Sequence, residues 1–450
     1  MGQLFGTDGI RGVANTAPLT AEMALAIGRA TAHICKKHNR RHRIVIGKDT
    51  RISGYMIENA LTAGICSMGV DVLLLGPMPT PGIAFTTRSM RADAGIVISA
   101  SHNPYQDNGI KIFSRDGFKL SDKLEEEIED LVSTGRINDI RPTADAVGRA
   151  KRIDDAIGRY IVFCKNTFPE DLTLEGLKIV IDCANGATYK VAPIIFSELG
   201  ADVVAIHDKP DGRNINENCG SQYTADLSQA VKDNDADIGL AFDGDGDRLI
   251  AVDETGTETT GDIIMGTCAS FMKDQSLLRK NLVIITPMTN FGVRIFFDDM
   301  KIRYKEAPVG DRNVLEMMQQ NGAVLGGEQS GHIIFRNYHT TGDGIISALQ
   351  LLSVMQQTGK TLSDLAKKIT LTPQKLINVN VKTKPPLEAL DGLQKALTEA
   401  QAQLGRKGRV LVRYSGTQFL CRVMVEGPDE KTTNTLAESL AGIVRSAIGA

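Results

Sequence analysis

One strand–helix–strand sequence pattern recurs along the chain, and this recurrence limits the folds that the chain can adopt. The first copy begins at the apolar stretch Arg43–Gly47 and ends at Gly69–Leu75, and the second runs from Leu177–Asp182 to Leu199–Val204. Both copies open on Ile-Val-Ile and close on Gly-x-Asp-Val. Short β-branched runs on either side of a helix-compatible segment predict a βαβ unit with parallel strands and a right-handed crossover.

A third, more degenerate copy begins at Asn281–Ile285 and closes near Ile302. Three such units in series favour repeated α/β domains of one topology over a single barrel. The pattern then changes to a smaller α+β domain, with strands predicted at 375–381 and 409–412 and helices at 386–403 and 430–448. Polar linkers are predicted at 136–155, 253–261 and 370–373, which gives four domains at 1–150, 156–255, 258–369 and 374–450.

Composition excludes several classes of protein. A net charge of −3 over 450 residues leaves no basic footprint for nucleic acid, and the absence of Trp argues against base stacking. No apolar run approaches the roughly 20 residues that span a bilayer, so no membrane role is expected. The N-terminus lacks a basic segment followed by a long apolar core, so no signal peptide is predicted. The seven cysteines are scattered without a C-x-x-C pair, which is typical of reduced thiols in the cytoplasm.

A tight loop carrying Ser101 lies between two predicted strands. Gly95–Ile98 is a short apolar run, Asn103-Pro104 is a turn signal, and Ile110–Phe113 is a second β-branched run. The loop therefore presents a hydroxyl, the His102 imidazole and an amide at its tip, in one fixed geometry. The alternative is an ordinary polar turn in which the serine hydroxyl bonds to nearby backbone.

Three aspartates alternate with glycines in the run Asp243–Arg248, between predicted strands at 238–242 and 249–252. The glycines let the backbone turn all three carboxylates toward one point, where a hard divalent cation would offset their repulsion. Three monodentate carboxylates leave coordination positions open, as a substrate-bound Mg²⁺ requires, and Arg248 could neutralise a transferring phosphoryl group. A solvated acidic turn is the alternative. An EF-hand is excluded because Arg248 stands where that loop needs Gly and the flanks are strands.

Two further loops carry groups suited to a phosphorylated sugar. The Gly-rich stretch Leu325–His332 presents carboxylate and hydroxyl groups that could bond sugar hydroxyls, and a generic polar turn explains it equally well. The stretch Arg413–Thr417, with Arg422 beyond it, gathers guanidinium forks, hydroxyls and a glycine N–H, which suit a phosphate clamp. A surface hairpin with scattered arginines is the alternative. Because no Walker loop or Rossmann fingerprint is present, nucleotide binding has little support, and the absence of Gly-x-Ser-x-Gly weakens the case for an α/β-hydrolase triad.

Together these motifs resemble the α-D-phosphohexomutase superfamily. Ser-Ala-Ser101-His-Asn-Pro, Asp-Gly-Asp-Gly-Asp-Arg248, Gly-Glu-Gln-Ser-Gly-His332 and Arg-Tyr-Ser-Gly-Thr417 stand in that family's order, at family-like spacing, over essentially the whole chain. The opening Phe5–Gly12 and the stretches Val309–Arg312, Gly326–His332 and Thr340–Gly344 are most similar to its bacterial phosphoglucosamine mutase branch. The family pattern at the clamp is usually Ser-Gly-Thr-Glu-Pro, whereas this chain has Gln418-Phe419 after Thr417, which could loosen the loop.

The resemblance implies three related α/β domains and a smaller C-terminal α+β domain around a central cleft. It implies that Ser101 is phosphorylated and that one Mg²⁺ binds the seryl phosphate together with Asp243, Asp245 and Asp247. The groups expected around the reacting phosphate are Arg11, His102, Lys111, Arg248 and His332. Those expected to hold the sugar and its second phosphate are Asp311, Glu328, Ser330, Arg413, Ser415, Gly416, Thr417 and Arg422.

The activity implied by the resemblance is interconversion of glucosamine 6-phosphate and glucosamine 1-phosphate through a bisphosphorylated sugar. A homodimer is compatible with this reading. Phosphomannomutase or phosphoglucomutase specificity is the near alternative, since no single residue is visibly dedicated to the 2-amino group. A metal-dependent phosphatase uses the same parts, and a non-catalytic sugar-phosphate binding protein is the remaining class.

Overall fold

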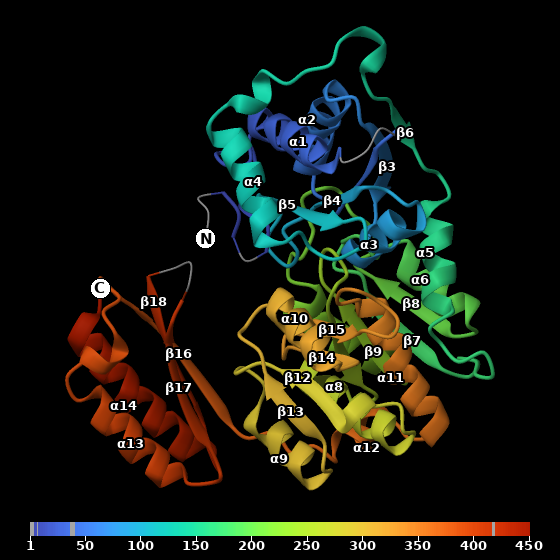
Figure 1. Cartoon of the computed structure of the whole chain (residues 1–450). Coiled ribbons are helices and arrows are strands. Elements are labelled where there is room, and N and C mark those ends of the chain that lie inside the picture. Colours follow the sequence, from blue (N-terminus) through green and yellow to red (C-terminus); the bar gives the residue numbers. More distant parts are fainter. Residues whose placement is uncertain (1–3, 7, 37–40, 416–418) are drawn as a thin grey trace. The chain divides into compact units, whose positions relative to one another are not determined.

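The computed structural model describes residues 4–6, 8–36, 41–415 and 419–450. The chain divides into two compact units (Figure 1). The first unit comprises Met1–Met288 and Ile302–Lys367, and the second comprises Thr289–Lys301 and Lys368–Ala450. Among the helices in these described ranges, none combines the length and the apolar character needed to cross a membrane.

Three sheets of the first unit share one strand order, which confirms the predicted repeat. In each sheet the first strand lies between the second and third, parallel to both, and a fourth strand pairs antiparallel with the third. In chain order, the strands are β2 (Arg43–Lys48), β3 (Asp71–Pro77), β4 (Ala94–Ile98) and β5 (Asp107–Ser114); β7 (Lys178–Asp182), β8 (Asp202–Ile206), β9 (Ile238–Phe242) and β10 (Leu249–Asp253); β12 (Leu282–Ile285), β13 (Arg303–Glu306), β14 (Leu325–Gly327) and β15 (Ile333–Phe335).

Helices follow the strands as the sequence predicts. Thr20 caps the first helix by accepting a hydrogen bond from the Met23 amide at 3.3 Å, and this helix ends at Cys35. The helices of the first unit are α1 (Ala21–Cys35), α2 (Ser53–Ser67), α3 (Thr80–Ser89), α4 (Asp122–Ser133), α5 (Ala156–Lys165), α6 (Val191–Glu198), α7 (Ala225–Asp233), α8 (Gly261–Asp274), α10 (Asp311–Asn321), α11 (Gly344–Thr358) and α12 (Leu362–Ala366).

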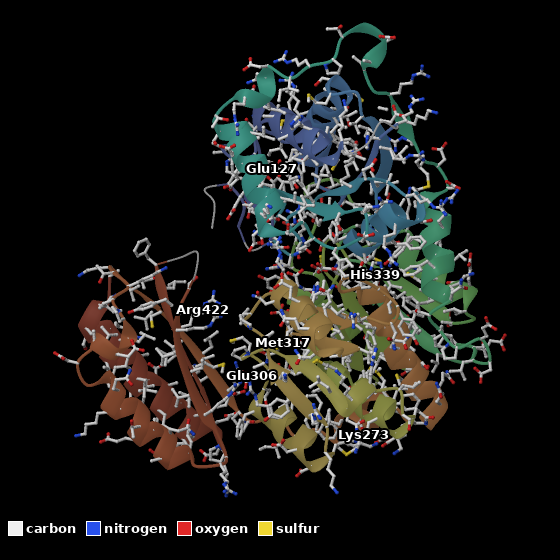
Figure 2. The ribbon with its side chains drawn as sticks, viewed as in Figure 1. Glu127, Lys273, Glu306, Met317, His339 and Arg422 are labelled. Carbon is white, nitrogen blue, oxygen red and sulfur yellow. The ribbon has the colours of Figure 1, made fainter. Side chains whose placement is uncertain are left out.

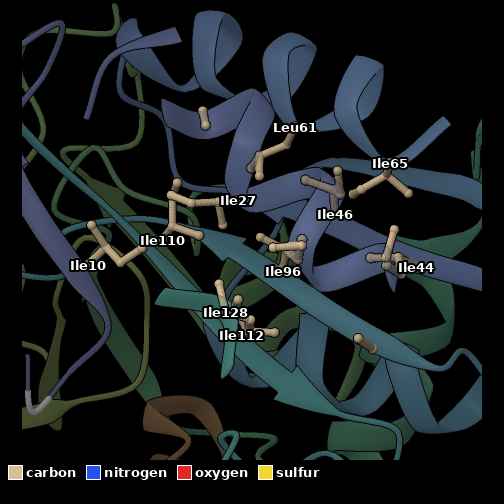
Figure 3. Close-up of a cluster of buried hydrophobic side chains, with 14 of the residues drawn as sticks. Ile10, Ile27, Ile44, Ile46, Leu61, Ile65, Ile96, Ile110, Ile112 and Ile128 are labelled. Atoms are coloured by element: carbon tan, nitrogen blue, oxygen red, sulfur yellow. The ribbon is translucent and has the colours of Figure 1, made fainter. Parts of the chain in front are cut away.

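The first sheet is covered on both faces at its centre, so β2 and β4 are buried almost throughout. Side chains of α1, α2 and α4 pack with Ile44, Ile46 and Ile96 on one face (Figure 3). The alternate residues point the other way, toward α3, where a side chain at Gly95 would collide with Thr87. This burial on both faces is typical of parallel sheets, and it makes the strand ends a rigid support for loops.

Three short strands that pattern reasoning did not predict extend the sheets. The polar linker predicted at 136–155 contains β6 (Ala150–Arg152), which pairs with β3, and the linker at 253–261 contains β11 (Glu258–Thr259), which pairs with β10. The polar opening contains β1 (Ile10–Val13), which pairs antiparallel with β5. These strands lack an apolar pattern because backbone pairing, not side-chain burial, holds most of their residues.

The second unit is a three-stranded antiparallel sheet with two helices packed on it, the small α+β domain that the sequence predicts. Its elements are β16 (Gln374–Asn380), β17 (Arg409–Tyr414), β18 (Leu420–Glu426), α13 (Leu393–Leu404) and α14 (Glu430–Ile448), in the sheet order β16-β18-β17 (Figure 1). The unit also takes α9 (Phe291–Asp299) from within the predicted third domain. The reason is hydrogen bonding, since the Phe291 amide donates to Glu426 at 3.0 Å and the Thr372 amide donates to Asn290 at 2.9 Å.

Candidate active site

Three loops in equivalent positions of the three repeats carry most of the predicted site. The Ser101 loop joins β4 to β5, the acidic loop joins β9 to β10, and the Glu328 loop joins β14 to β15. Each loop therefore leaves the carboxyl end of a buried parallel strand, which is where α/β folds place their ligands. Repetition of one topology thus supplies three loops mounted in the same way.

Ser101 lies in a strained turn beside the acidic loop. Its φ angle is +51°, a left-handed conformation that is uncommon for residues other than glycine and often marks a functional site. The buried hydroxyl donates a hydrogen bond to Asp243 Oδ2 at 2.6 Å and lies 3.2 Å from His102 Nδ1. The serine predicted to carry a phosphate and the loop predicted to hold a metal are therefore in direct contact.

A buried arginine fixes the backbone of the Ser101 loop. Arg51 is fully enclosed, and its Nε pairs with Asp49 Oδ2 at 2.7 Å. Its two terminal nitrogens donate to four carbonyl oxygens of the turn, those of Ser101 at 3.0 Å, Asn103 at 2.8 Å, Asp107 at 2.9 Å and Pro104. A planar guanidinium can satisfy several acceptors at once, so one side chain sets the shape of the whole turn.

The second repeat holds the same turn from the other side. Asn216 donates its amide hydrogens to the carbonyl oxygens of Ser101 at 2.9 Å and Asn103 at 3.0 Å. The acidic loop approaches so closely that a Cβ at Gly244 would lie 2.6 Å from the Ser101 carbonyl oxygen, so only glycine fits there. The serine is thus clamped between two domains.

The acidic loop has the chemistry of a cation site. One carboxylate oxygen from each of Asp243, Asp245 and Asp247 lies within 4.8 Å of the others, and all three residues are buried. Burial, together with the charges of Asp247 and Asp245, raises the pKa of Asp243 well above its usual range. Among the described residues, the buried Oδ1 atoms of Asp245 and Asp247 have no hydrogen-bond partner. Oxygen donors left in this state fit a hard divalent cation such as Mg²⁺.

Lys111 and Thr80 orient one of these carboxylates. Asp245 Oδ2 accepts hydrogen bonds from Lys111 Nζ at 3.0 Å and from the Thr80 hydroxyl at 2.7 Å. Burial opposes the charge on Lys111, but the carboxylates of Asp245, Asp8 and Asp247 outweigh it and raise the lysine pKa. Lys111 therefore stays cationic beside the site, where it can stabilise a phosphoryl group.

An ion-pair chain links the first and third repeats next to the acidic loop. Asp8 pairs with Arg11 and Lys119, and Lys119 Nζ also contacts Asp311 Oδ2 at 2.6 Å. Arg11 in turn donates to the carbonyl oxygen of Ala100 at 3.1 Å, one residue before the serine. Two predicted residues, Arg11 and Asp311, are thus connected through two that were not predicted.

The two histidines of the site have opposite protonation preferences. Burial, followed by the charges of Arg248 and Arg11, lowers the pKa of His102 to about 4, so this imidazole is neutral. Burial also opposes the charge on His332, but Asp247, 3.5 Å from its Nδ1, and Asp311 outweigh it and raise the pKa to about 9. The site therefore offers a neutral imidazole beside the serine and a cationic one beside the acidic loop.

The third loop brings Glu328 to the start of α10. Glu328 Oε1 accepts a hydrogen bond from the Gly310 amide at 3.0 Å, which places this carboxylate beside Asp311. Ser330, in the same loop, is half-buried. Arg248 follows the acidic loop, its own amide donating to Asp243 Oδ1 at 3.2 Å, and its side chain approaches Asp247 at 3.9 Å. The predicted sugar-contacting and phosphate-neutralising groups of the first unit thus lie on two adjacent loops.

The predicted phosphate clamp belongs to the second unit. Arg413 on β17 stands directly opposite Arg422 on β18, which is labelled in Figure 2. Burial and the charge of Arg422 lower the pKa of Arg413. Two facing cations repel each other unless an anion lies between them, so the pair favours a phosphate ligand. Ser415 is buried at the end of this hairpin, while Gly416, Thr417 and Gln418 lie outside the described residues.

Sequence reasoning missed several residues that build this site. Asp8 lies inside the Phe5–Gly12 motif, so the motif carried a signal that was not assigned to a residue. The others lie in segments whose local sequence shows no motif for them. The missed residues are Asp8, Asp49, Arg51, Thr80, Lys119 and Asn216.

Comparison with known proteins gives a consistent result along the whole chain. Family models for the phosphoglucomutase/phosphomannomutase α/β/α domains I, II and III match residues 2–138, 159–256 and 260–371, and the model for the C-terminal domain matches 376–443. The chain is 57% identical over 449 residues to the phosphoglucosamine mutase of Syntrophus aciditrophicus, with 100% of both chains covered. It is 58% identical over 449 residues to that of Syntrophobacter fumaroxidans, again with 100% of both covered. A crystal structure of a phosphoglucomutase/phosphomannomutase family protein from Burkholderia thailandensis shares the fold, with a TM-score of 0.80, 23% identity and 98% and 97% of the two chains covered.

Proposed function

The chain belongs to the phosphoglucosamine mutase family, and we propose that it interconverts α-D-glucosamine 6-phosphate and α-D-glucosamine 1-phosphate by means of a phosphoryl group carried on Ser101. The observation that carries this proposal is the 2.6 Å contact between the serine hydroxyl and Asp243 inside a buried cluster of three aspartates. A hydroxyl held there can accept and release a phosphoryl group at the place where a bound cation would offset the charge of that group.

The reaction balances as two transfers of one phosphoryl group. In the first, the bond between phosphorus and the Ser101 oxygen breaks and a bond to the free sugar oxygen forms, while a carboxylate of the site takes up the proton of that hydroxyl. The bisphosphorylated sugar then turns end for end, and its other phosphate returns to Ser101. The phosphoserine is thereby restored, the sugar oxygen that lost its phosphoryl group regains a proton, and the sugar leaves as the isomeric monophosphate.

Each side chain has a role in this scheme. Asp243, Asp245 and Asp247 would hold Mg²⁺ with the seryl phosphate, and the bound ion would supply charge that stabilises the phosphoryl oxygens. Lys111 and Arg248 add positive charge, and Arg11 adds more beside Ala100. Neutral His102, 3.2 Å from the serine oxygen, can exchange a hydrogen bond with it.

The remaining residues would bind the sugar and its non-reacting phosphate. Glu328 and Ser330 supply acceptors for hydroxyl groups, and His332 is a cation for a phosphate oxygen. The phosphate at the other end would bind Arg413, Ser415, Gly416, Thr417 and Arg422. A clamp that holds only phosphate serves both orientations of the sugar, because both ends of the intermediate carry the same group.

The carboxylates of Asp311 and Glu328 favour an amino sugar. Glucosamine 6-phosphate carries an ammonium group at neutral pH, where mannose and glucose 6-phosphates carry a hydroxyl. We expect the phosphorylated protein to prefer glucosamine 6-phosphate by at least about tenfold in kcat/KM when the three compete. A preference for mannose 6-phosphate or glucose 6-phosphate would indicate the phosphomannomutase/phosphoglucomutase specificity instead. Release of inorganic phosphate in excess of isomerised sugar would indicate a phosphatase.

Replacing Thr80 with valine tests the proposed metal site without touching a metal ligand. The hydroxyl that orients Asp245 Oδ2 is lost, while the shape of the side chain is kept. Outer hydrogen bonds of this kind typically change metal affinity 10–100-fold, so we expect Mg²⁺ to bind about 10–100-fold more weakly by calorimetric titration. Thr86→Val is the matched control, because its hydroxyl bonds to Gly82 within the same helix. Equal Mg²⁺ affinity in the two variants would contradict the assignment of Asp245 as a ligand.

A further inference from the structure

A second cluster of metal-binding side chains lies in the second repeat, apart from the three aspartates. Asp182 ends β7, His207 follows β8, and Cys219 lies just before the short 3₁₀ helix Gly220–Gln222. One donor atom from each of Asp182, His207 and Cys219 lies within 4.8 Å of the other two. The parallel pairing of β7 with β8 places Asp182 opposite Ile206, and the Gly220 amide donates to Asp182 Oδ2 at 2.8 Å. Sheet register and one backbone hydrogen bond therefore bring the three residues together.

The geometry of His207 points to a ligand. Its Nδ1 lies 3.2 Å from Asp182 Oδ1, yet among the described residues this buried nitrogen has no aligned hydrogen bond. Its Nε2 lies 3.4 Å from Asp226 Oδ2. In metal sites, one histidine nitrogen binds the ion while a carboxylate orients the other. His207 also has a φ angle of +46°, an unfavourable backbone conformation that turns the ring toward the cluster at a cost that a bound ion would offset.

We propose that Asp182, His207 and Cys219 form a Zn²⁺ site. Carboxylate, imidazole and thiolate are the three ligand types that zinc takes in proteins, whereas Mg²⁺ binds oxygen and avoids sulfur. Three protein ligands leave a fourth position for water. Asp182 and Cys219 are fully buried and His207 is a quarter exposed, so the imidazole side gives the ion its entry path.

The ion would brace the loop that holds the catalytic serine turn. The chain between His207 and Cys219 carries Asn216, whose amide bonds to the carbonyl oxygens of Ser101 and Asn103. Zinc at this cluster would tie both ends of that segment to the end of β7. The proposed role of the ion is to hold this segment in place. Zinc binding can therefore be measured independently of the mutase reaction.

Replacing zinc with Co²⁺ tests this site directly by absorption spectroscopy. Co²⁺ replaces zinc and gives a near-ultraviolet charge-transfer band only when a thiolate binds it, so the three aspartates, first saturated with Mg²⁺, stay silent. We expect the full-length protein to show this band at one equivalent of Co²⁺, Cys219→Ser to lose it, and Cys268→Ser, which removes a buried thiol from α8, to keep it. Absence of the band in the wild-type protein, or its persistence in Cys219→Ser, overturns the proposal.

Asp226→Asn gives a second test that does not disturb the core, because Asp226 is two-thirds exposed. We expect it to weaken Zn²⁺ binding about 10–100-fold in the presence of excess Mg²⁺, as the loss of an orienting carboxylate does. Zn²⁺ should raise the Tm of the wild-type protein and of His33→Gln but not of His207→Gln. If Zn²⁺ leaves the wild-type Tm unchanged, or raises that of His207→Gln equally, the cluster is a metal-free ion pair.

Discussion

Ser101→Ala is expected to lower mutase turnover by at least about 10⁴-fold, because the variant lacks the oxygen that receives and returns the phosphoryl group. The loss should appear in kcat, measured by phosphorus NMR of the two glucosamine phosphates. Intact-mass analysis should show one phosphoryl group on the wild-type protein and none on the variant. Turnover within tenfold of wild type would contradict the role given to Ser101.

Ser99→Ala is the matched control for this prediction. Its hydroxyl lies in the same turn, donates to Asp49 Oδ2 at 2.6 Å and accepts from the Ser101 amide at 2.9 Å, so its loss perturbs the turn without removing the carrier. The Ser99 variant should still be phosphorylated and should lose less activity than Ser101→Ala. Mg²⁺ should bind both variants, because the three aspartates remain. A phosphoryl group that appears on Ser101→Ala in intact-mass analysis, with turnover equal to that of Ser99→Ala, would show that another residue carries the phosphate.

The fold was predictable because the strand patterns of the α/β unit recur along the chain, the third time in a more degenerate form. Ile-Val-Ile at the start of β2 and β7 marks central parallel strands that are buried almost throughout, and such burial requires continuous apolar runs. Gly-x-Asp-Val marks their parallel neighbours β3 and β8. The strand β6 was not predicted, because all three of its residues are exposed and only its backbone pairs with β3. No side-chain period marks a strand of that kind.

The site residues also fall into two groups, those that a local sequence motif identifies and those that only the folded structure brings to the site. Asp243, Asp245 and Asp247 were predictable because one short run contains the whole cluster. Arg51 and Asn216 act on Ser101 across 50 and 115 residues of sequence, and nothing near either residue signals the contact. What sequence motifs identified was the chemistry. What they missed was the support that sets its geometry.

Arg51 is the clearest case of such support, and its replacement is the second large effect expected. Arg51→Met leaves the fully buried Asp49 carboxylate without its cation, and removing one partner of a buried ion pair typically costs about 3–5 kcal/mol in the free energy of unfolding. Arg51→Lys keeps the charge but loses the planar fork, so it cannot reach Asp49 and four carbonyl oxygens together. Denaturant unfolding measures the first loss, and kcat of the lysine variant measures the second.

A combined variant separates stability from function at this position. Replacing Asp49 with leucine alongside Arg51→Met removes both charges, so unfolding free energy should recover part of the loss. The kcat should stay low, because the guanidinium no longer holds the turn and only the Asn216 amide remains on the carbonyl oxygens of Ser101 and Asn103. Arg159→Lys, whose pair with Asp155 is exposed, should stay within about 0.5 kcal/mol of wild type in unfolding free energy and keep full activity. If kcat recovers together with stability in the double variant, the arginine matters only to the fold; if kcat stays low in a stable protein, Arg51 positions the serine for phosphoryl transfer.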